Sequence, residues 1–120
     1  MSIAVELAEL RAVADGQAPF AYLLTVGEGA RVHAIALVPA IGDGEIVCEA
    51  GRSSCANAAA RPDVSLLWPP GAPGDYSLIV DGVASVDGSV VRIVPGRAVR
   101  HRPAVGGGSD CAPVELTSEG

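Results

Sequence analysis

Lysine is absent from this sequence, and charged residues of all kinds make up only 18% of its 120 positions. A soluble domain usually carries about 25% charged residues. Part of the surface is therefore expected to be apolar and to face a partner subunit. With a net charge of -6 the chain repels phosphate backbones, so we expect no nucleic acid partner.

Long apolar runs and metal-binding patterns are also missing. The longest apolar stretch, residues 34–41, is too short to span a bilayer, and the N-terminus shows no positively charged leader. We therefore expect a cytoplasmic protein without membrane contact. Cys48, Cys55 and Cys111 lack metal-ligand spacing and are expected to be free thiols in a reducing compartment, so no metal site is predicted.

The length fits a single domain over residues 1–105, followed by a flexible C-terminal tail, residues 106–120, that opens with three glycines and a serine. Ser2 is a possible cap for an N-terminal helix over residues 3–14, where Ile3, Leu7, Leu10 and Ala14 fall on one stripe.

Most of the remaining chain has the composition of short strands. The expected strands are residues 21–26, 31–39, 45–49, 64–68, 76–86 and 90–94. Asp43-Gly44 and Asp87-Gly88 predict hairpin turns, and Gly82 predicts a bulge. Short helices are expected at residues 55–61 and 95–101. Strand 31–39 is apolar on both faces, as expected where one face covers a core and the other meets a subunit or ligand. Six antiparallel strands of this kind suit a small closed or split barrel, and a sandwich is also compatible.

Several segments together resemble one known family. They are residues 21–26 and 32–36, Gly51-Arg52-Ser53-Ser54 with Asn57, residues 61–68 and 76–84, Arg97-Ala98-Val99 with His101-Arg102-Pro103, and Asp110-Cys111. Their order and spacing resemble those of the pyridoxamine 5′-phosphate oxidase-like, or FMN-binding split barrel, family, in particular its small actinobacterial members.

The resemblance implies a fold, an assembly and a ligand class. The implied fold is mainly β, a six-stranded antiparallel split β-barrel with short helices. The implied assembly is a homodimer with two cofactor sites at the subunit interface. The implied cofactor is FMN or a deazaflavin coenzyme, although some relatives bind haem instead. The implied activity is that of an oxidoreductase whose substrate the sequence does not name, acting on a small molecule.

The candidate cofactor site combines two segments. Arg52, Ser53 and Ser54 stand just before the expected helix, where free backbone N–H groups and the helix dipole favour a phosphate. The alternative is that a serine only caps the helix and that Arg52 is a solvated loop residue. Asn57 belongs to the same segment by resemblance, and Val38-Pro39 with Ala40 would seat the flavin ring.

One departure from the family pattern supports a second interpretation. Phosphate-binding members place a lysine or arginine a few residues before the asparagine, whereas Ser54, Cys55 and Ala56 stand here. The alternative function is a non-catalytic split-barrel dimer that has lost the cofactor or binds another small ligand. The sequence offers no acid, base or nucleophile pattern, so the catalytic residues stay unknown and a bound flavin would carry the hydride.

A second basic cluster follows near the end of the predicted domain. Arg97, Arg100, His101 and Arg102 lie in the expected helix 95–101 or just after it. They are expected either to contact a phosphate or polyanionic coenzyme tail, or only to complement the helix dipole. Trp68 and Tyr76 flank a Pro/Gly loop and either cover a pocket or anchor the core.

Overall fold

The structure, a computed structural model, describes residues 1–104, and the predicted tail 106–120 lies outside them. The described strands are β1 (Ser2–Val5), β2 (Ala21–Val26), β3 (Val32–Leu37), β4 (Ala40–Ile41), β5 (Ile46–Glu49), β6 (Asp63–Trp68), β7 (Ser77–Asp87) and β8 (Val90–His101). The described helices are the 3-10 turns η1 (Leu7–Glu9) and η2 (Glu28–Ala30) and the α-helices α1 (Leu10–Asp15) and α2 (Arg52–Ala60).

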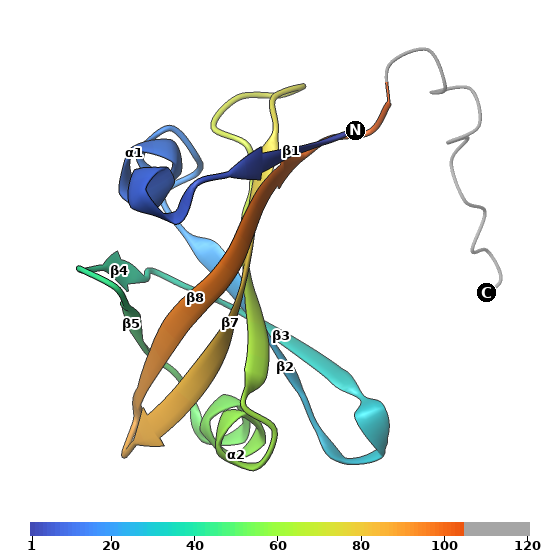
Figure 1. Cartoon of the computed structure of the whole chain (residues 1–120). Helices are drawn as coiled ribbons and strands as arrows, with labels where there is room; N and C mark the ends of the chain where they lie inside the picture. The colour runs from blue at the N-terminus through green and yellow to red at the C-terminus, as the bar shows by residue number, and fades with distance from the viewer. Residues whose placement is uncertain (105–120) are drawn as a thin grey trace, which may run out of the picture.

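The strands form one strongly curled antiparallel sheet, which confirms the mainly β, split-barrel prediction (Figure 1). The order along the sheet is β3-β2-β6-β7-β8-β5-β4. The long strand β8 pairs with β7 along one edge, and its other edge pairs first with β5 and then with β1. Helices α1 and α2 lie at opposite ends of the curled sheet (Figure 1). Neither is long and apolar enough to cross a membrane.

The core fills the concave side of this sheet. Alternate residues of β2, β6, β7 and β8 point inward, and the most completely buried side chains include Leu23, Leu66, Leu78, Val80 and Ile93. Complete burial of a side chain of this size stabilises the fold by about 1.5–3 kcal/mol. These strands therefore supply most of the apolar burial that holds the barrel together.

The prediction of a helix over residues 3–14 is wrong for its first half. Residues 2–5 form β1 and pair with β8 from Ser2 opposite His101 to Val5 opposite Ala98. The apolar stripe was compatible with a helix, but β-branched Ile3 and Val5 also suit a strand, and the unpaired edge of β8 decides between them. The helix end predicted at Asp15-Gly16 is correct.

The prediction of a helix over residues 95–101 is also wrong, because β8 continues to His101. Pro95 usually ends a strand, since it has no N–H to donate. Here it pairs with Gly82 where the register of β7 and β8 shifts between Asp81 and Gly82. A bulge is thus present at Gly82 as predicted, but its extra residue is Gly96 of β8, since Asp81 pairs with Arg97 and Gly82 with Pro95. The bulge allows a proline inside the strand.

Residues 1–104 contain eight strands rather than the predicted six, because β1 and the two-residue β4 join the predicted set. The turn at Asp43-Gly44 connects β4 to β5 as predicted. Helix α2 begins at Arg52 instead of residue 55, with Gly51 in the N-cap position.

Candidate functional site

The convex face of the sheet is apolar and exposed. Alternate residues of β2 and β3 face outward, so that Leu24 pairs with Ala34 and Val26 with Val32. On β7 and β8 the outward pair is Val83 and Val94. Val32 is 64% exposed, Val83 54% and Val94 59%. This confirms that β3 has two apolar faces, and it leaves a broad apolar surface with no cover from the described residues.

A groove of about 520 Å³ is cut into this convex face, and we call it the outer groove. It crosses strands β2, β3, β6, β7 and β8. The lining residues are Leu24, Thr25, Val26, Val32, Asp63, Val64, Ser65, Asp81, Gly82, Val83, Gly96 and Arg97. A groove of this size, mostly apolar with a few polar groups, is typical of a small-molecule site.

Three polar side chains meet on the floor of the outer groove. The Ser65 hydroxyl donates to Asp81 Oδ1 at 2.6 Å, and Arg97 Nη1 lies 3.4 Å from Asp81 Oδ2. The Arg97 side chain is 69% exposed, so its ion pair is screened by water and weak. Arg97 is therefore free to exchange this partner for a polar group of a bound ligand.

The β7–β8 bulge forms one wall of the outer groove. Gly82 and Gly96 both line it, and the interrupted ladder leaves backbone polar groups there that a ligand could reach. At the β2 end, Arg61 Nη1 donates to the carbonyl of Val26 at 3.3 Å. The groove thus combines apolar walls with backbone groups and the exposed cation of Arg97.

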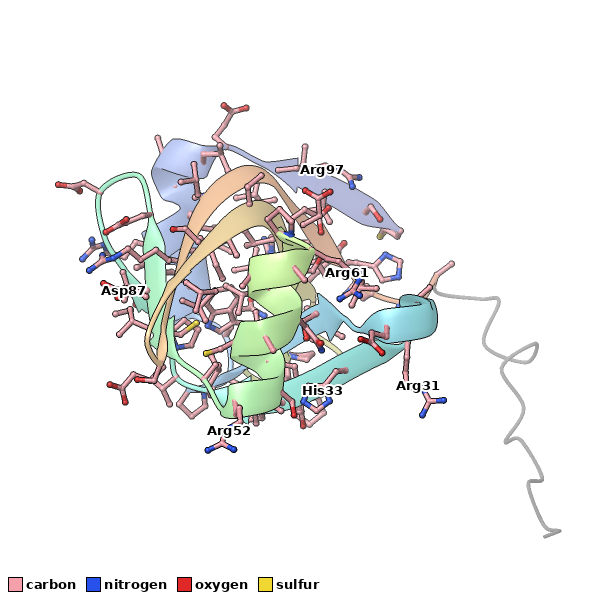
Figure 2. The ribbon with its side chains drawn as sticks, turned by 90° about the horizontal axis from the view of Figure 1, so that it is seen from below. Arg31, His33, Arg52, Arg61, Asp87 and Arg97 are labelled. Atoms are coloured by element: carbon pink, nitrogen blue, oxygen red, sulfur yellow. The ribbon has the colours of Figure 1, made fainter. Side chains whose placement is uncertain are left out.

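The predicted phosphate segment lies in the first turn of α2, not before it. The amide of Cys55 is the first to bond within the helix, to the Gly51 carbonyl, so the amides of Arg52, Ser53 and Ser54 are the free ones of the N-terminus. No side chain caps the helix. Arg52 points away from the molecule at the opposite end of α2 from Arg61 (Figure 2), whereas Ser54 is buried.

Asn57 has a structural contact inside the protein. Its Nδ2 donates to the hydroxyl of Thr25 at 3.2 Å, and Thr25 is completely buried. The amide group also lies against Gly27, where a Cβ would come within 3.3 Å of Asn57 Oδ1. Asn57 therefore ties α2 to the end of β2.

Val38 and Pro39, the predicted ring seat, line a different hollow. This second groove, about 500 Å³, lies between α1 and the β3–β4 connection, and Arg11, Gln17 and Trp68 also line it. Trp68 itself is buried in the core. Neither Arg52 nor Asn57 lines this groove or the outer groove. Within one chain, the structure does not bring the two predicted segments into a common pocket.

The second basic cluster is divided between the two faces of β8. Arg97 reaches the outer groove, whereas Arg100 and Arg102 stack on the ring of Tyr76. His101 Nδ1 lies 3.0 Å from the Ser2 hydroxyl. Because these residues belong to a strand or the segment just after it, the helix-dipole explanation for them is wrong.

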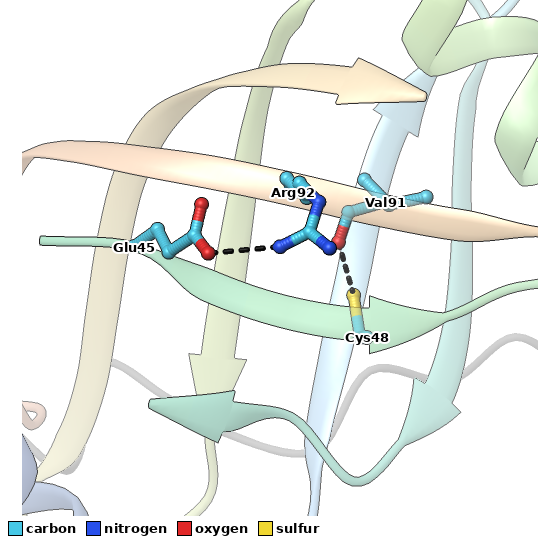
Figure 3. A network of polar contacts seen from close by, with 4 residues as sticks. All are labelled: Glu45, Cys48, Val91 and Arg92. Carbon is cyan, nitrogen blue, oxygen red and sulfur yellow. Dashed lines mark hydrogen bonds and ion pairs between the residues drawn. The ribbon is translucent and has the colours of Figure 1, made fainter. Parts of the chain in front are cut away.

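The thiol of Cys48 is buried and difficult to ionise. Burial, together with the neighbouring Cys55, raises the pKa of Cys48 to about 11, and its Sγ lies 3.8 Å from the Val91 carbonyl (Figure 3). Residues 1–104 contain no group of three or more His, Cys, Asp or Glu side chains placed to hold a metal ion.

The sequence analysis missed Ser65 and Asp81 as groove residues. A usable signal was present, because each is a polar residue between apolar neighbours at an outward position of its strand. Only the β6–β7 register, which pairs Ser65 with Asp81, brings them together.

Comparison with known proteins identifies two relatives by sequence. An uncharacterized protein of Mycobacterium bovis and one of Mycobacterium tuberculosis are each 42% identical to this chain, with 72% of both chains covered. No family model matches the sequence.

Solved structures share the fold at low sequence identity. A Listeria innocua protein described as a candidate pyridoxamine 5′-phosphate oxidase has a TM-score of 0.63 at 19% identity, covering 78% of this chain and 96% of its own. A FAD-binding protein of Mesorhizobium loti has a TM-score of 0.64 at 13% identity, covering 85% and 99%. A protein described as an F420 reductase has a TM-score of 0.58 at 14% identity, covering 69% and 90%.

Proposed function

We propose that this chain is an oxidoreductase that binds FMN or a deazaflavin coenzyme. The chain belongs to the same protein family as the two mycobacterial relatives. It has the pyridoxamine 5′-phosphate oxidase-like split-barrel fold. The observation that carries the proposal is the outer groove, an open apolar hollow with few polar groups on its floor. Proteins described as FAD-binding and as an F420 reductase share this fold.

The outer groove fits the ring of such a coenzyme. A flat heterocyclic ring needs apolar walls and a few fixed hydrogen-bonding groups. Leu24, Val32 and Val83 offer the walls. Arg97 offers side-chain donors, and the Ser65 hydroxyl, which itself donates to Asp81, offers an acceptor. When bound, the coenzyme would supply the hydride chemistry. The protein's own residues would bind and orient it and keep water away.

A second copy of the chain is the proposed cover of the groove. The convex face around it exposes large apolar side chains, and a monomer rarely leaves such a surface bare. Because a two-fold dimer uses the same patch on both copies, two convex faces would meet and enclose two grooves. This arrangement gives the predicted homodimer.

Sedimentation tests the dimer. The wild type should sediment at twice the 12.0 kDa of the chain, and Val83→Glu should give monomers, because burying an unpaired carboxylate in an apolar interface is costly. Leu7→Glu is the control, since Leu7 is also exposed but lies on η1. Wild-type monomers at micromolar concentration would refute the dimer.

The coenzyme proposal is tested by titrating the dimer with FMN and with the deazaflavin while following ligand fluorescence. Gly96→Leu should abolish binding, because the new side chain would fill the groove; a Cβ at residue 96 meets its nearest atom only at 4.0 Å. Arg52→Ala tests the phosphate site predicted at the α2 N-terminus. If Arg52→Ala weakens binding and Gly96→Leu does not, the coenzyme site lies at α2 and not in the outer groove. Binding of neither ligand by the folded wild-type dimer would refute the proposal and favour the alternative function without a flavin.

A further inference from the structure

Two arginines share one tyrosine ring at the β1 end of β8. The guanidinium carbon of Arg100 lies 4.9 Å from the centre of the Tyr76 ring, and that of Arg102 lies 4.4 Å from it. We call these three residues the Tyr76 cluster. Arg100 pairs with buried Leu78 on β7, so the cluster lies on the concave side of the sheet, opposite to the outer groove.

Backbone contacts hold the cluster in place. Arg102 donates its amide to the Met1 carbonyl at 3.2 Å, which extends the β1–β8 ladder by one step. The Tyr76 carbonyl accepts a hydrogen bond from Gln17 Nε2 at 2.8 Å, and Arg102 Nη1 lies 3.4 Å from the Gly74 carbonyl. Arg100 is thus held by β8, and Arg102, just past the end of β8, is held by its backbone contact with Met1 and by the Gly74 carbonyl.

The positive charge of the cluster has no acidic partner within residues 1–104. The ion pairs of the described chain lie elsewhere and join Arg92 to Glu45 and Arg97 to Asp81. The Nε atoms of Arg100 and Arg102 are both buried and have no hydrogen-bond acceptor among residues 1–104. A buried donor without a partner is costly, and two cations beside one ring repel each other.

Apolar neighbours increase the attraction that an anion would feel at this place. Leu78 on β7 and Ile3 on β1 flank Arg100 in the sheet register. Apolar surroundings lower the local dielectric constant and strengthen charge–charge interactions. An anion bound beside both guanidinium groups would offset their repulsion and accept hydrogen bonds from them.

We propose that the Tyr76 cluster is a binding site for the phosphate group of a small molecule. A phosphate monoester dianion matches the two positive charges, and its oxygens suit the planar, forked donors of arginine. The site is separate from the coenzyme proposed above, because none of its three residues lines the outer groove. The proposal therefore stands or falls independently of the coenzyme.

The test is an NMR titration of the full-length protein that follows the Nε–Hε signals of its arginines. Inorganic phosphate and glycerol 3-phosphate are added separately, and sodium chloride at equal ionic strength serves as the salt control. Arg100→Gln and Arg102→Gln each remove one signal and thereby assign it. Arg92, on the same strand but paired with Glu45 at 2.8 Å (Figure 3), is the matched internal control.

Saturable shifts of the Arg100 and Arg102 signals, with Arg92 unmoved, are the expected result. Each glutamine variant should weaken binding by about tenfold or more, because it removes one charge-assisted contact. Tighter binding of glycerol 3-phosphate than of phosphate would show that the site takes an organic phosphate; equal binding would show that phosphate itself is enough. Shifts of all arginines that sodium chloride reproduces would overturn the proposal. If a variant fails to fold, triple-resonance assignment of the wild type identifies the same signals, and the wild-type titration decides.

Discussion

An alanine at residue 82 would collide with the neighbouring strand. Its Cβ would lie 2.6 Å from Ile93 Cγ2, 2.7 Å from the Val94 carbonyl oxygen and 3.2 Å from Pro95 Cα. Two of these atoms belong to the backbone of β8, so they cannot move aside without opening the β7–β8 pairing. We expect Gly82→Ala to lower the free energy of unfolding by about 2 kcal/mol, since overpacking costs about 1–3 kcal/mol. The melting temperature should fall by about 10 °C.

Gly96→Ala is the matched control, because Gly96 belongs to the same bulge but a Cβ there meets only the Asp81 carbonyl oxygen at 4.0 Å. Neither glycine has a positive φ, so alanine should leave stability unchanged at residue 96, or raise it by up to about 1 kcal/mol through the unfolded chain. Urea unfolding at one protein concentration, followed by the fluorescence of the single tryptophan, measures both. Equal midpoints for the two variants would refute the packing argument.

Three further predictions concern the core, α2 and the Pro/Gly loop. Burial raises the pKa of Cys48 from 9.0 to about 11, so the folded state keeps a proton that the unfolded chain loses. The free energy of unfolding should therefore fall as pH rises from 9 to 11, by about 3 kcal/mol at most. Cys48→Ala should flatten this pH dependence in urea unfolding. Asn57→Ala removes the donor to the buried hydroxyl of Thr25 and should cost about 1–2 kcal/mol in the same assay without ligand; an unchanged midpoint would contradict the structural role. Gln17 Nε2 donates to carbonyls at both ends of loop 69–75, so Gln17→Ala should speed cleavage there by a nonspecific protease, and an unchanged cleavage rate would show that the loop is held otherwise.

Local chemistry allowed much of this fold to be predicted from sequence. The Asp43-Gly44 turn follows from the backbone freedom of glycine, since Gly44 has a positive φ. Gly82 marks a close approach of two strands that excludes a side chain, and the alternation of β3 follows from the two-residue period of a strand. The ends of the chain could not be predicted in this way. Residues 2–5 are a strand only because β8 offers them a free edge, and β8 continues through Pro95 only because the bulge at Gly96 follows directly after it.

The candidate site was less accessible from sequence than the fold. The outer-groove residues Ser65, Asp81 and Arg97 come from three strands. Only the register of β6, β7 and β8 brings them together on the floor of this groove. The predicted residues Arg52 and Val38 lie in separate parts of the chain's surface, because α2 and the β3–β4 connection belong to different ends of the curled sheet. Whether they contribute to binding stays a prediction that the Arg52→Ala titration addresses.

The most direct test of the account is sedimentation velocity of the wild type with a stoichiometric amount of coenzyme, recorded in the visible absorption band of the ligand. FMN and the deazaflavin are run separately. The account predicts that the absorbance of one of them moves with a species of twice 12.0 kDa. It is contradicted if the protein sediments as a dimer while both ligands stay behind, or if the ligand moves with a monomer.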